Sequence, residues 1–188
     1  MTTLSPLTTG NDTDRLAALR LAQARGYMRQ APINAAVQIF VTSVTAWLLL
    51  GHVPAGWLAA WYAYMLVVSL DLAWRWWRSR RTPMTRVSAR AIRRATRFAI
   101  VTGTVWGSSG LFLAELPPML QAGVFIMIAG MAGGAATILS PLPAAAAGYL
   151  TATMLPSIAR LLTLPTAEHH VAGVVALIYF RADLGWWP

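Results

Sequence analysis

The residues of this 188-residue chain that could transfer protons or bind metals are few: three histidines, six carboxylates and no cysteine. Without cysteine there are no disulfides, thiolate metal sites or cysteine nucleophiles. The candidates fall in short polar segments between apolar ones: His52, Glu115, Glu168, His169 and His170. Imidazole and carboxylate groups are ligands for zinc, copper or nickel, and such histidines would also respond to pH. Their spacing matches no metal motif, so ordinary loop polarity is the competing interpretation.

Recognisable catalytic motifs are absent from the sequence. It contains no His-Glu-x-x-His, no phosphate-binding P-loop, no Gly-x-Ser-x-Gly and no paired carboxylates. Six acidic residues also leave little for general acid–base chemistry. We therefore expect these residues to form no enzyme and to hold no cofactor or catalytic metal.

Two charged residues lie in or beside apolar stretches, where a charge is costly and is a functional candidate. Asp71 precedes Arg75 by four residues, so an i, i+4 ion pair on one helix explains it. Arg160 follows Pro156 by four residues. It could extend toward the membrane surface, pair with Glu115 or Glu168, or bind an anionic ligand.

The distribution of charge along the chain predicts the fold class. Hydrophobic residues make up 57% of the chain and charged residues 11%, whereas a soluble domain is typically about 25% charged. No Asp, Glu, Lys or Arg occurs in residues 31–70 or 116–159, and nine arginines without an acid lie between Arg75 and Arg97. We expect an all-α polytopic transmembrane bundle of about six helices.

The domain organisation follows from these segments. Residues 1–30 would be a cytoplasmic tail with a short amphipathic helix, 31–181 the six-helix transmembrane domain, and 182–188 a short tail. The expected helices are 33–50, 55–74, 98–114, 119–139, 144–162 and a sixth from 171. Only residues 171–180 are uncharged before Arg181, so the sixth helix would just cross a thinned bilayer. A truncated or frame-shifted end of a longer protein is the alternative.

Arginine counts predict the orientation, because short cytoplasmic loops collect basic residues. The first thirty residues carry four arginines and the segment from Arg75 to Arg97 carries nine, whereas the loops at His52, Glu115 and Glu168 carry none. Both termini would be cytoplasmic, in a bacterial inner membrane. Expected partners are the bilayer, anionic headgroups at the arginine segment, an unknown small ligand and a second copy in a homodimer, but no nucleic acid.

Aromatic and small residues add local expectations. Trp57, Trp61, Tyr62 and Tyr64 near one end of the second helix, and Trp74, Trp76 and Trp77 near the other, predict two interfacial belts. Gly103-x-x-x-Gly107 and Gly130-x-x-x-Gly134 permit close helix approach. The second motif precedes Ser140-Pro141-Leu142-Pro143, which indicates either tight packing or a hinge between the fourth and fifth helices.

Two segments resemble a known family: FAIVTGTVWGSSGLFLAELP and VFIMIAGMAGGAATILSPLPAAAAGYLTATMLPSIARLL. Over about residues 30–180 the chain is similar to the N-terminal membrane region of proteobacterial signalling proteins, namely GGDEF/EAL cyclic-di-GMP enzymes and hybrid histidine kinases. The shared features are Trp-Gly in the third helix, a Gly/Ala-rich fourth helix, a proline break, and Pro followed by Arg in the fifth. Here these are Trp106-Gly107, residues 131–136, Pro141 with Pro143, and Pro156 with Arg160.

In that family the sixth helix leads to a catalytic output domain, which these residues do not include. The resemblance implies a sensory or regulatory membrane module whose signal acts near the outer face and whose output is a shift of the sixth helix or of dimerisation. We expect Trp106, Gly107, Gly134, Pro141 and Pro156 to act in packing and hinging, and Arg160 in charge recognition. The alternative, a small multi-pass transporter or channel subunit, is suggested by the proline breaks.

Overall fold

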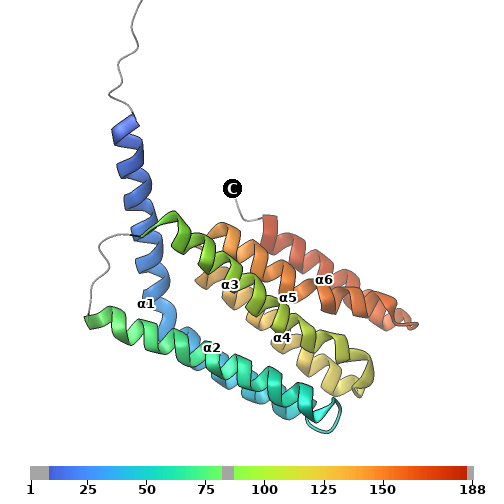
Figure 1. Cartoon of the computed structure of the whole chain (residues 1–188). Coiled ribbons are helices and arrows are strands. Elements are labelled where there is room, and N and C mark those ends of the chain that lie inside the picture. Colours follow the sequence, from blue (N-terminus) through green and yellow to red (C-terminus); the bar gives the residue numbers. More distant parts are fainter. Residues whose placement is uncertain (1–8, 82–86, 186–188) are drawn as a thin grey trace, which may run out of the picture.

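A computed structural model describes residues 9–81 and 87–185, and within them it is entirely helical (Figure 1). The elements are α1 (Thr9–Leu49), α2 (Ala55–Arg81), α3 (Ala89–Ser108), the 3₁₀ helix η1 (Ser109–Glu115), α4 (Pro118–Ile138), α5 (Pro143–Thr163) and α6 (Ala167–Gly185). The expected all-α class and six helices are confirmed.

Helices α1 and α2 form an antiparallel hairpin, as the short turn between them predicts. Gly51 in that turn has a φ of 82°, a conformation that favours glycine. Buried residues recur at alternating steps of three and four in both helices: Ala31, Ala35, Gln38, Thr42, Thr45 and Leu49 in α1, and Leu58, Trp61, Met65, Val68 and Leu72 in α2. A repeat of about 3.5 residues is typical of left-handed coiled-coil packing. The Ser43 and Tyr62 hydroxyls, 3.1 Å apart, form a hydrogen bond across this seam.

Helices α3 and α5 pack closely because glycines on α3 and η1 leave no side chain between the backbones. A Cβ built on Gly103 would lie 2.7 Å from the carbonyl oxygen of Tyr149. Ile100 meets Gly148, 48 positions later, and Gly110 meets Ser157, 47 positions later. Because the difference in residue number between contacting residues stays nearly constant, α3 and α5 run parallel.

Helix α5 is the centre of the second block, which comprises α3 to α6. It contacts α3, η1, α4 and α6. Its buried residues form two adjacent rows at i, i+4 spacing: Ala145, Tyr149, Thr153, Ser157 and Leu161, and Ala146, Leu150, Met154 and Ile158. The opposite face, with Thr151, Leu155 and Ala159, is exposed. We refer to α3–α6 as the bundle and to α1–α2 as the hairpin.

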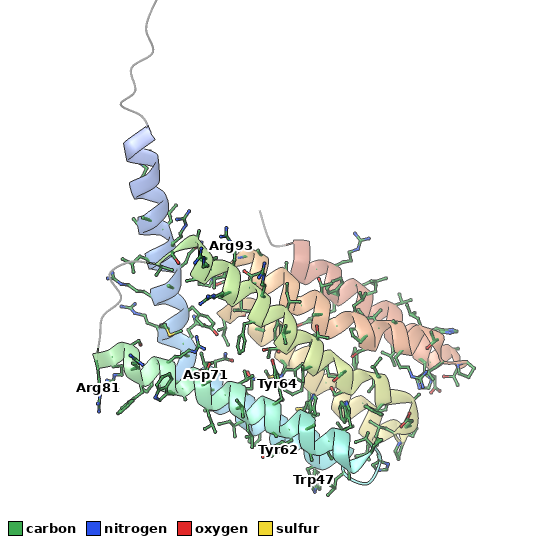
Figure 2. The ribbon with its side chains drawn as sticks, in the orientation of Figure 1. Trp47, Tyr62, Tyr64, Asp71, Arg81 and Arg93 are labelled. Atoms are coloured by element: carbon green, nitrogen blue, oxygen red, sulfur yellow. The ribbon has the colours of Figure 1, made fainter. Side chains whose placement is uncertain are left out.

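The two ends of the molecule differ in charge (Figures 1 and 2). At one end, the turn end, lie the α1–α2, η1–α4 and α5–α6 connections. At the other, the arginine end, lie the end of α2, the start of α3, the α4–α5 turn and the end of α6. Arg81 and Arg93 mark this end in Figure 2. Here Gly26 of α1 approaches Pro141 of the α4–α5 turn: a Cβ built on Gly26 would lie 3.6 Å from Pro141 Cγ.

Some helix boundaries differ from those expected. The separate amphipathic helix predicted within residues 1–30 is wrong, because α1 is one helix of 41 residues that continues through Pro32. Ala31 and Ala35, on either side of that proline, are buried against Leu72, and this packing compensates for the hydrogen bond that proline removes. Residues 1–8 lie outside the described part of the chain.

The sixth helix is longer than expected. It spans 19 residues and includes Arg181, which is a good helix former. Much of the tail predicted at 182–188 is therefore the last turn of α6, and residues 186–188 lie outside the described part. The second helix likewise continues beyond the expected residue 74 to Arg81.

The chain is a membrane protein by the length and composition of its helices. Three segments are long and apolar enough to cross a bilayer: Ala17–Leu49, Ala55–Arg81 and Pro118–Ile138. Large apolar side chains point outward along them, including Phe40 at 66% exposure, Val67 at 64% and Ile126 at 63%. In water such a surface would drive aggregation, whereas in lipid it is solvated.

Adding one methyl group at two glycines should have opposite effects. Gly107→Ala places a Cβ against the carbonyl oxygens of Ala152 and Thr153, which are backbone atoms and cannot move aside. We expect a destabilisation of about 1–3 kcal/mol from overpacking. Gly134→Ala meets no atom within 4 Å, so it should be neutral or stabilise by about 0.5–1 kcal/mol through helix propensity. Thermal unfolding in detergent measures both. Equal losses of thermal stability in the two variants would contradict the close contact between α3 and α5.

Candidate functional site

Gly107 and Pro156 meet where α3 packs on α5. Trp106 is fully buried, and Gly107 lies against Pro156, whose Cγ would be 3.1 Å from a Cβ at that glycine. The proline lies inside α5, where it removes one backbone hydrogen bond and can bend a helix. Gly107 and Pro156 therefore form a packed contact between two neighbouring helices, while the packing and hinging roles of Trp106, Gly107 and Pro156 stay predictions.

Trp106 also belongs to a group of aromatic rings that connects the hairpin to the bundle. Its ring lies edge-on to Trp61 of α2, with centroids 5.3 Å apart, and Trp57 contacts Phe112 of η1 at 4.5 Å. The indole Nε1–H of Trp61 donates a 2.8 Å hydrogen bond to the Val105 carbonyl oxygen. We call these four rings the aromatic joint. Edge-to-face aromatic pairs contribute about 0.5–1.5 kcal/mol beyond their burial.

The prediction that Trp61 belongs to an interfacial belt is wrong. Only 3% of its surface is exposed, because it occupies the buried seam of α2 between Leu58 and Met65. Trp61 follows Leu58 by three residues and precedes Met65 by four, and this spacing in the sequence indicates a buried position. Trp47, at the turn end of α1 and 72% exposed, does face outward, as Figure 2 shows.

Several polar groups are buried in the protein interior without a hydrogen-bond partner among the described residues. They include the hydroxyls of Thr42 and Thr45 on α1, Thr102 on α3 and Ser157 on α5, and the Trp106 indole nitrogen. Leaving such a group unsatisfied costs about 1–3 kcal/mol. These groups lie both in the hairpin seam, at Thr42 and Thr45, and in the bundle, at Thr102 and Ser157.

Arg160 lies in the last turn of α5, and its Nε is buried. It makes no ion pair in the described part of the chain, so the predicted pairing with Glu115 or Glu168 is not formed. Its Nε likewise has no hydrogen-bond partner there. A partly buried guanidinium without a carboxylate partner fits the two remaining interpretations, extension toward the membrane surface or contact with an anion.

The polar residues of the turn end do not assemble a metal site. Within residues 9–81 and 87–185 no group of three His, Asp or Glu side chains could hold an ion. His52, Glu115, Glu168 and His170 are exposed. His169 instead hydrogen-bonds through Nε2 to Gln121 Oε1 at 3.0 Å and through Nδ1 to the Thr166 hydroxyl.

Gln121 extends that network to a third element. Its Nε2 donates to the Leu113 carbonyl oxygen of η1 at 3.0 Å. The resulting chain of hydrogen bonds connects the start of α6, the start of α4 and η1. His169 therefore holds helices together at the turn end, a role that residue spacing did not predict.

The predicted hinge residues lie apart from one another. Gly134 faces open space, whereas its neighbour Gly133 packs against α6, with the Tyr179 hydroxyl 2.5 Å from a built Cβ. Pro141 lies in the α4–α5 turn, beside Gly26 of α1. Gly133 therefore contributes to a contact of α4 with α6, whereas the predicted hinge lay between α4 and α5.

The arginine end carries a regular arrangement of side chains. Arg75 Nε and Asp71 Oδ2 are 2.7 Å apart, which confirms the predicted pair. Farther along α2, three guanidinium groups lie over tryptophan rings four residues earlier: Arg78 over Trp74 at 5.5 Å, Arg80 over Trp76 at 5.0 Å and Arg81 over Trp77 at 3.8 Å. Cation–π contacts of this kind suit the bilayer interface.

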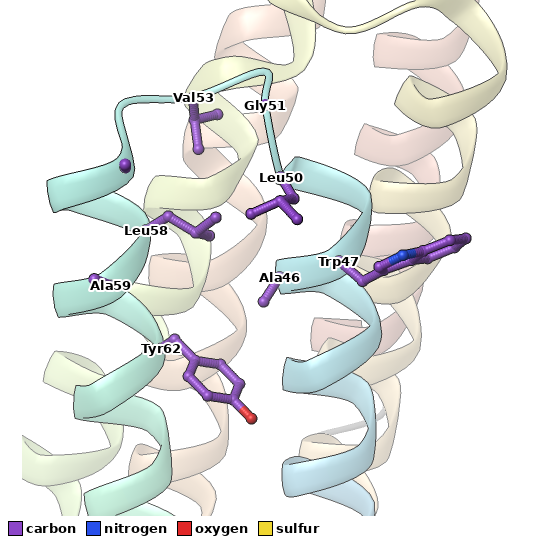
Figure 3. Close-up of a pocket in the computed structure, with 9 residues that line it drawn as sticks. Ala46, Trp47, Leu50, Gly51, Val53, Leu58, Ala59 and Tyr62 are labelled. Atoms are coloured by element: carbon purple, nitrogen blue, oxygen red, sulfur yellow. The ribbon is translucent and has the colours of Figure 1, made fainter.

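One cleft lies between α1 and α2 at the turn end (Figure 3). It encloses about 410 Å³ and is lined mainly by apolar side chains, among them Trp47, Leu50, Val53, Leu58 and Tyr62. The Tyr62 hydroxyl already bonds to Ser43. The cleft therefore offers little chemistry to a polar ligand.

No protein-family model, curated protein or solved structure matches the chain. The likeness to bacterial signalling proteins thus depends on the quoted motifs, and the function has to be argued from the geometry of the helices.

Proposed function

We propose that this chain is an integral membrane sensory or regulatory module whose two states differ in how the hairpin packs on the bundle. The main support is the contrast between the packing within the bundle and the packing of the hairpin on the bundle. Within the bundle, α3 and α5 meet backbone to backbone. Between hairpin and bundle, α1 approaches α4, while α2 is held mainly by the aromatic joint.

Six crossings of a bacterial inner membrane agree with the helix lengths. Helices α4 and α5 each have 21 residues, about 31 Å at 1.5 Å per residue, against a hydrocarbon core of ~30 Å. Helix α6, with 19 residues, spans about 28 Å. Because α3, α4 and α6 each pack against α5, the four helices would occupy the same slab of lipid. The arginine end would then be cytoplasmic.

Signal transfer would follow from the position of α1. Its outer half packs in the hairpin seam, and its inner part touches the α4–α5 turn at Gly26 and Pro141. A tilt of the hairpin at the turn end would therefore change contacts at the arginine end. A ligand, ion or lipid state drives such a change only through different affinities for the two arrangements.

A transporter or channel subunit is the second candidate. The buried, unpartnered hydroxyls of Thr42, Thr45 and Thr102 favour it, because a polar interior can line a path for small solutes. Solute flux into liposomes that contain this chain alone would separate the two. A sensor module gives no flux above that of empty liposomes.

Topology can be measured with single cysteines, because the natural chain has none. Six crossings predict that a membrane-impermeant maleimide labels intact spheroplasts carrying His52→Cys, Glu115→Cys or His170→Cys. It should label Arg90→Cys, Ser140→Cys and Arg181→Cys only after permeabilisation. Labelling of Glu115→Cys and Ser140→Cys from the same side would contradict the crossing of α4.

The two-state proposal predicts a movement between hairpin and bundle. Spin labels at Ser79→Cys on α2 and Arg181→Cys on α6 should give two distance populations in nanodiscs, with weights that differ between short-chain and long-chain phosphatidylcholine. Trp61→Phe removes the 2.8 Å bond to Val105, worth about 1 kcal/mol, and should shift these weights several-fold.

The matched control for that experiment is Trp47→Phe, which changes an exposed ring outside the aromatic joint. It should leave the weights unchanged. A single distance, identical in both lipids and in Trp61→Phe, would refute a hairpin that moves on the bundle.

A further inference from the structure

A shallow cleft runs along the lipid-facing side of the α3–α5 pair. It encloses about 690 Å³, and its walls are Ile100 and Thr104 of α3 and small or apolar residues of α5, including Gly148, Thr151, Leu155 and Ala159. The small residues that bring the two backbones together also leave this surface hollow. Its lining carries no charge.

Arginines continue the α3 wall of the cleft toward the arginine end. Arg93 and Arg97 precede Ile100 and Thr104 at steps of four, three and four, which places all four residues on one face of the helix. Both arginines are exposed. Neither forms an ion pair with another residue in the described part of the chain.

The register of the two helices places a second positive feature beside these arginines. Since Ile100 meets Gly148 and the helices are parallel, Arg97 lies level with the first turn of α5. That turn begins at Pro143, and its N-cap residue Leu142 offers no side-chain hydrogen bond. The N-terminus of a helix carries partial positive charge. Pro143 has no N–H, and the Ala145 and Ala146 N–H groups already donate to the Leu142 carbonyl oxygen, so the attraction for an anion at this end of the cleft comes from the helix dipole and the two guanidinium groups.

The length of the cleft matches one lipid tail. Along α5 it extends from Ala147 to Ala159, about 18 Å at 1.5 Å per residue. One leaflet is half of the ~30 Å hydrocarbon core, or about 15 Å. An uncharged hollow of leaflet depth, with guanidinium groups at one end, has the shape and charge of a phospholipid.

We infer that this cleft binds one anionic phospholipid of the cytoplasmic leaflet. Its phosphate contacts Arg93 and Arg97, and one acyl chain lies between α3 and α5. Guanidinium groups form charge-assisted hydrogen bonds with phosphate oxygens, which are stronger than neutral ones. The inference rests on the proposed insertion of α3 and α5 into the bilayer, but not on the sensory role.

The headgroup contact is tested by native mass spectrometry of the detergent-purified chain titrated with phosphatidylglycerol or phosphatidylcholine. The natural chain should retain one phosphatidylglycerol with at least tenfold preference over phosphatidylcholine. The pair Arg93→Ala and Arg97→Ala should weaken phosphatidylglycerol binding about tenfold or more. The pair Arg78→Ala and Arg81→Ala removes the same charge from α2 and should have less than a twofold effect. Equal losses in both pairs would show diffuse electrostatics and overturn the site.

The acyl-chain contact is tested by filling the cleft. Thr151 is exposed on its floor, so Thr151→Trp should fold normally and reduce retention of phosphatidylglycerol at least tenfold. Ile126→Trp, on the exposed face of α4, is the control and should retain the lipid. Unchanged retention in Thr151→Trp would exclude the cleft. Loss of a dimer in that variant, with no lipid bound to the natural chain, would instead assign the cleft to a second copy.

Two further measurements distinguish binding of a free anion from failure of the proposed membrane insertion. Excess inorganic phosphate should not displace the bound lipid, and displacement would mean that the arginines bind a free anion. Failure of the proposed insertion would appear in the maleimide labelling of Arg90→Cys and Glu115→Cys, which lipid retention in detergent does not affect.

Discussion

The close approach of α3 and α5 is the contact on which the bundle depends. Gly103, Gly107 and Gly110 let the α3 backbone lie directly against α5. In lipid, apolar side chains gain little by leaving their surroundings, so helix association relies on close van der Waals packing of this kind. The contact sets the parallel register, places α5 at the centre for α4 and α6, and leaves the cleft that begins beside Arg97.

The hairpin is attached differently, and that difference connects structure to proposed function. Its own seam follows a coiled-coil repeat, but α2 reaches the bundle mainly through large aromatic rings and one hydrogen bond. Buried hydroxyls on α1, at Thr42 and Thr45, have no partner in the described structure. The proposed function uses this contrast: the backbones of α3 and α5 are in direct contact, whereas α2 reaches the bundle through side chains that can repack.

Sequence patterns predicted what is local to one helix. The all-α class, the hairpin turn, the Asp71–Arg75 pair and the helices near 119–139 and 144–162 followed from charge, proline position and length. What depends on the rotation of one helix against another was missed: Trp61 is buried, Gly133 packs instead of Gly134, and Arg160 has no carboxylate partner. Continuation of α1 through Pro32 depends on Leu72, a residue far away in sequence.

The parallel register of α3 and α5 is tested most directly by engineered disulfides in native membranes, since the natural chain has no cysteine to interfere. Ile100→Cys combined with Gly148→Cys should form an intramolecular disulfide on mild oxidation, because these residues are in contact. Ile100→Cys combined with Ala159→Cys should stay reduced, because these residues lie at opposite ends of the cleft. A disulfide in the second pair and none in the first would mean that the helices run antiparallel, and would contradict the structure of the bundle.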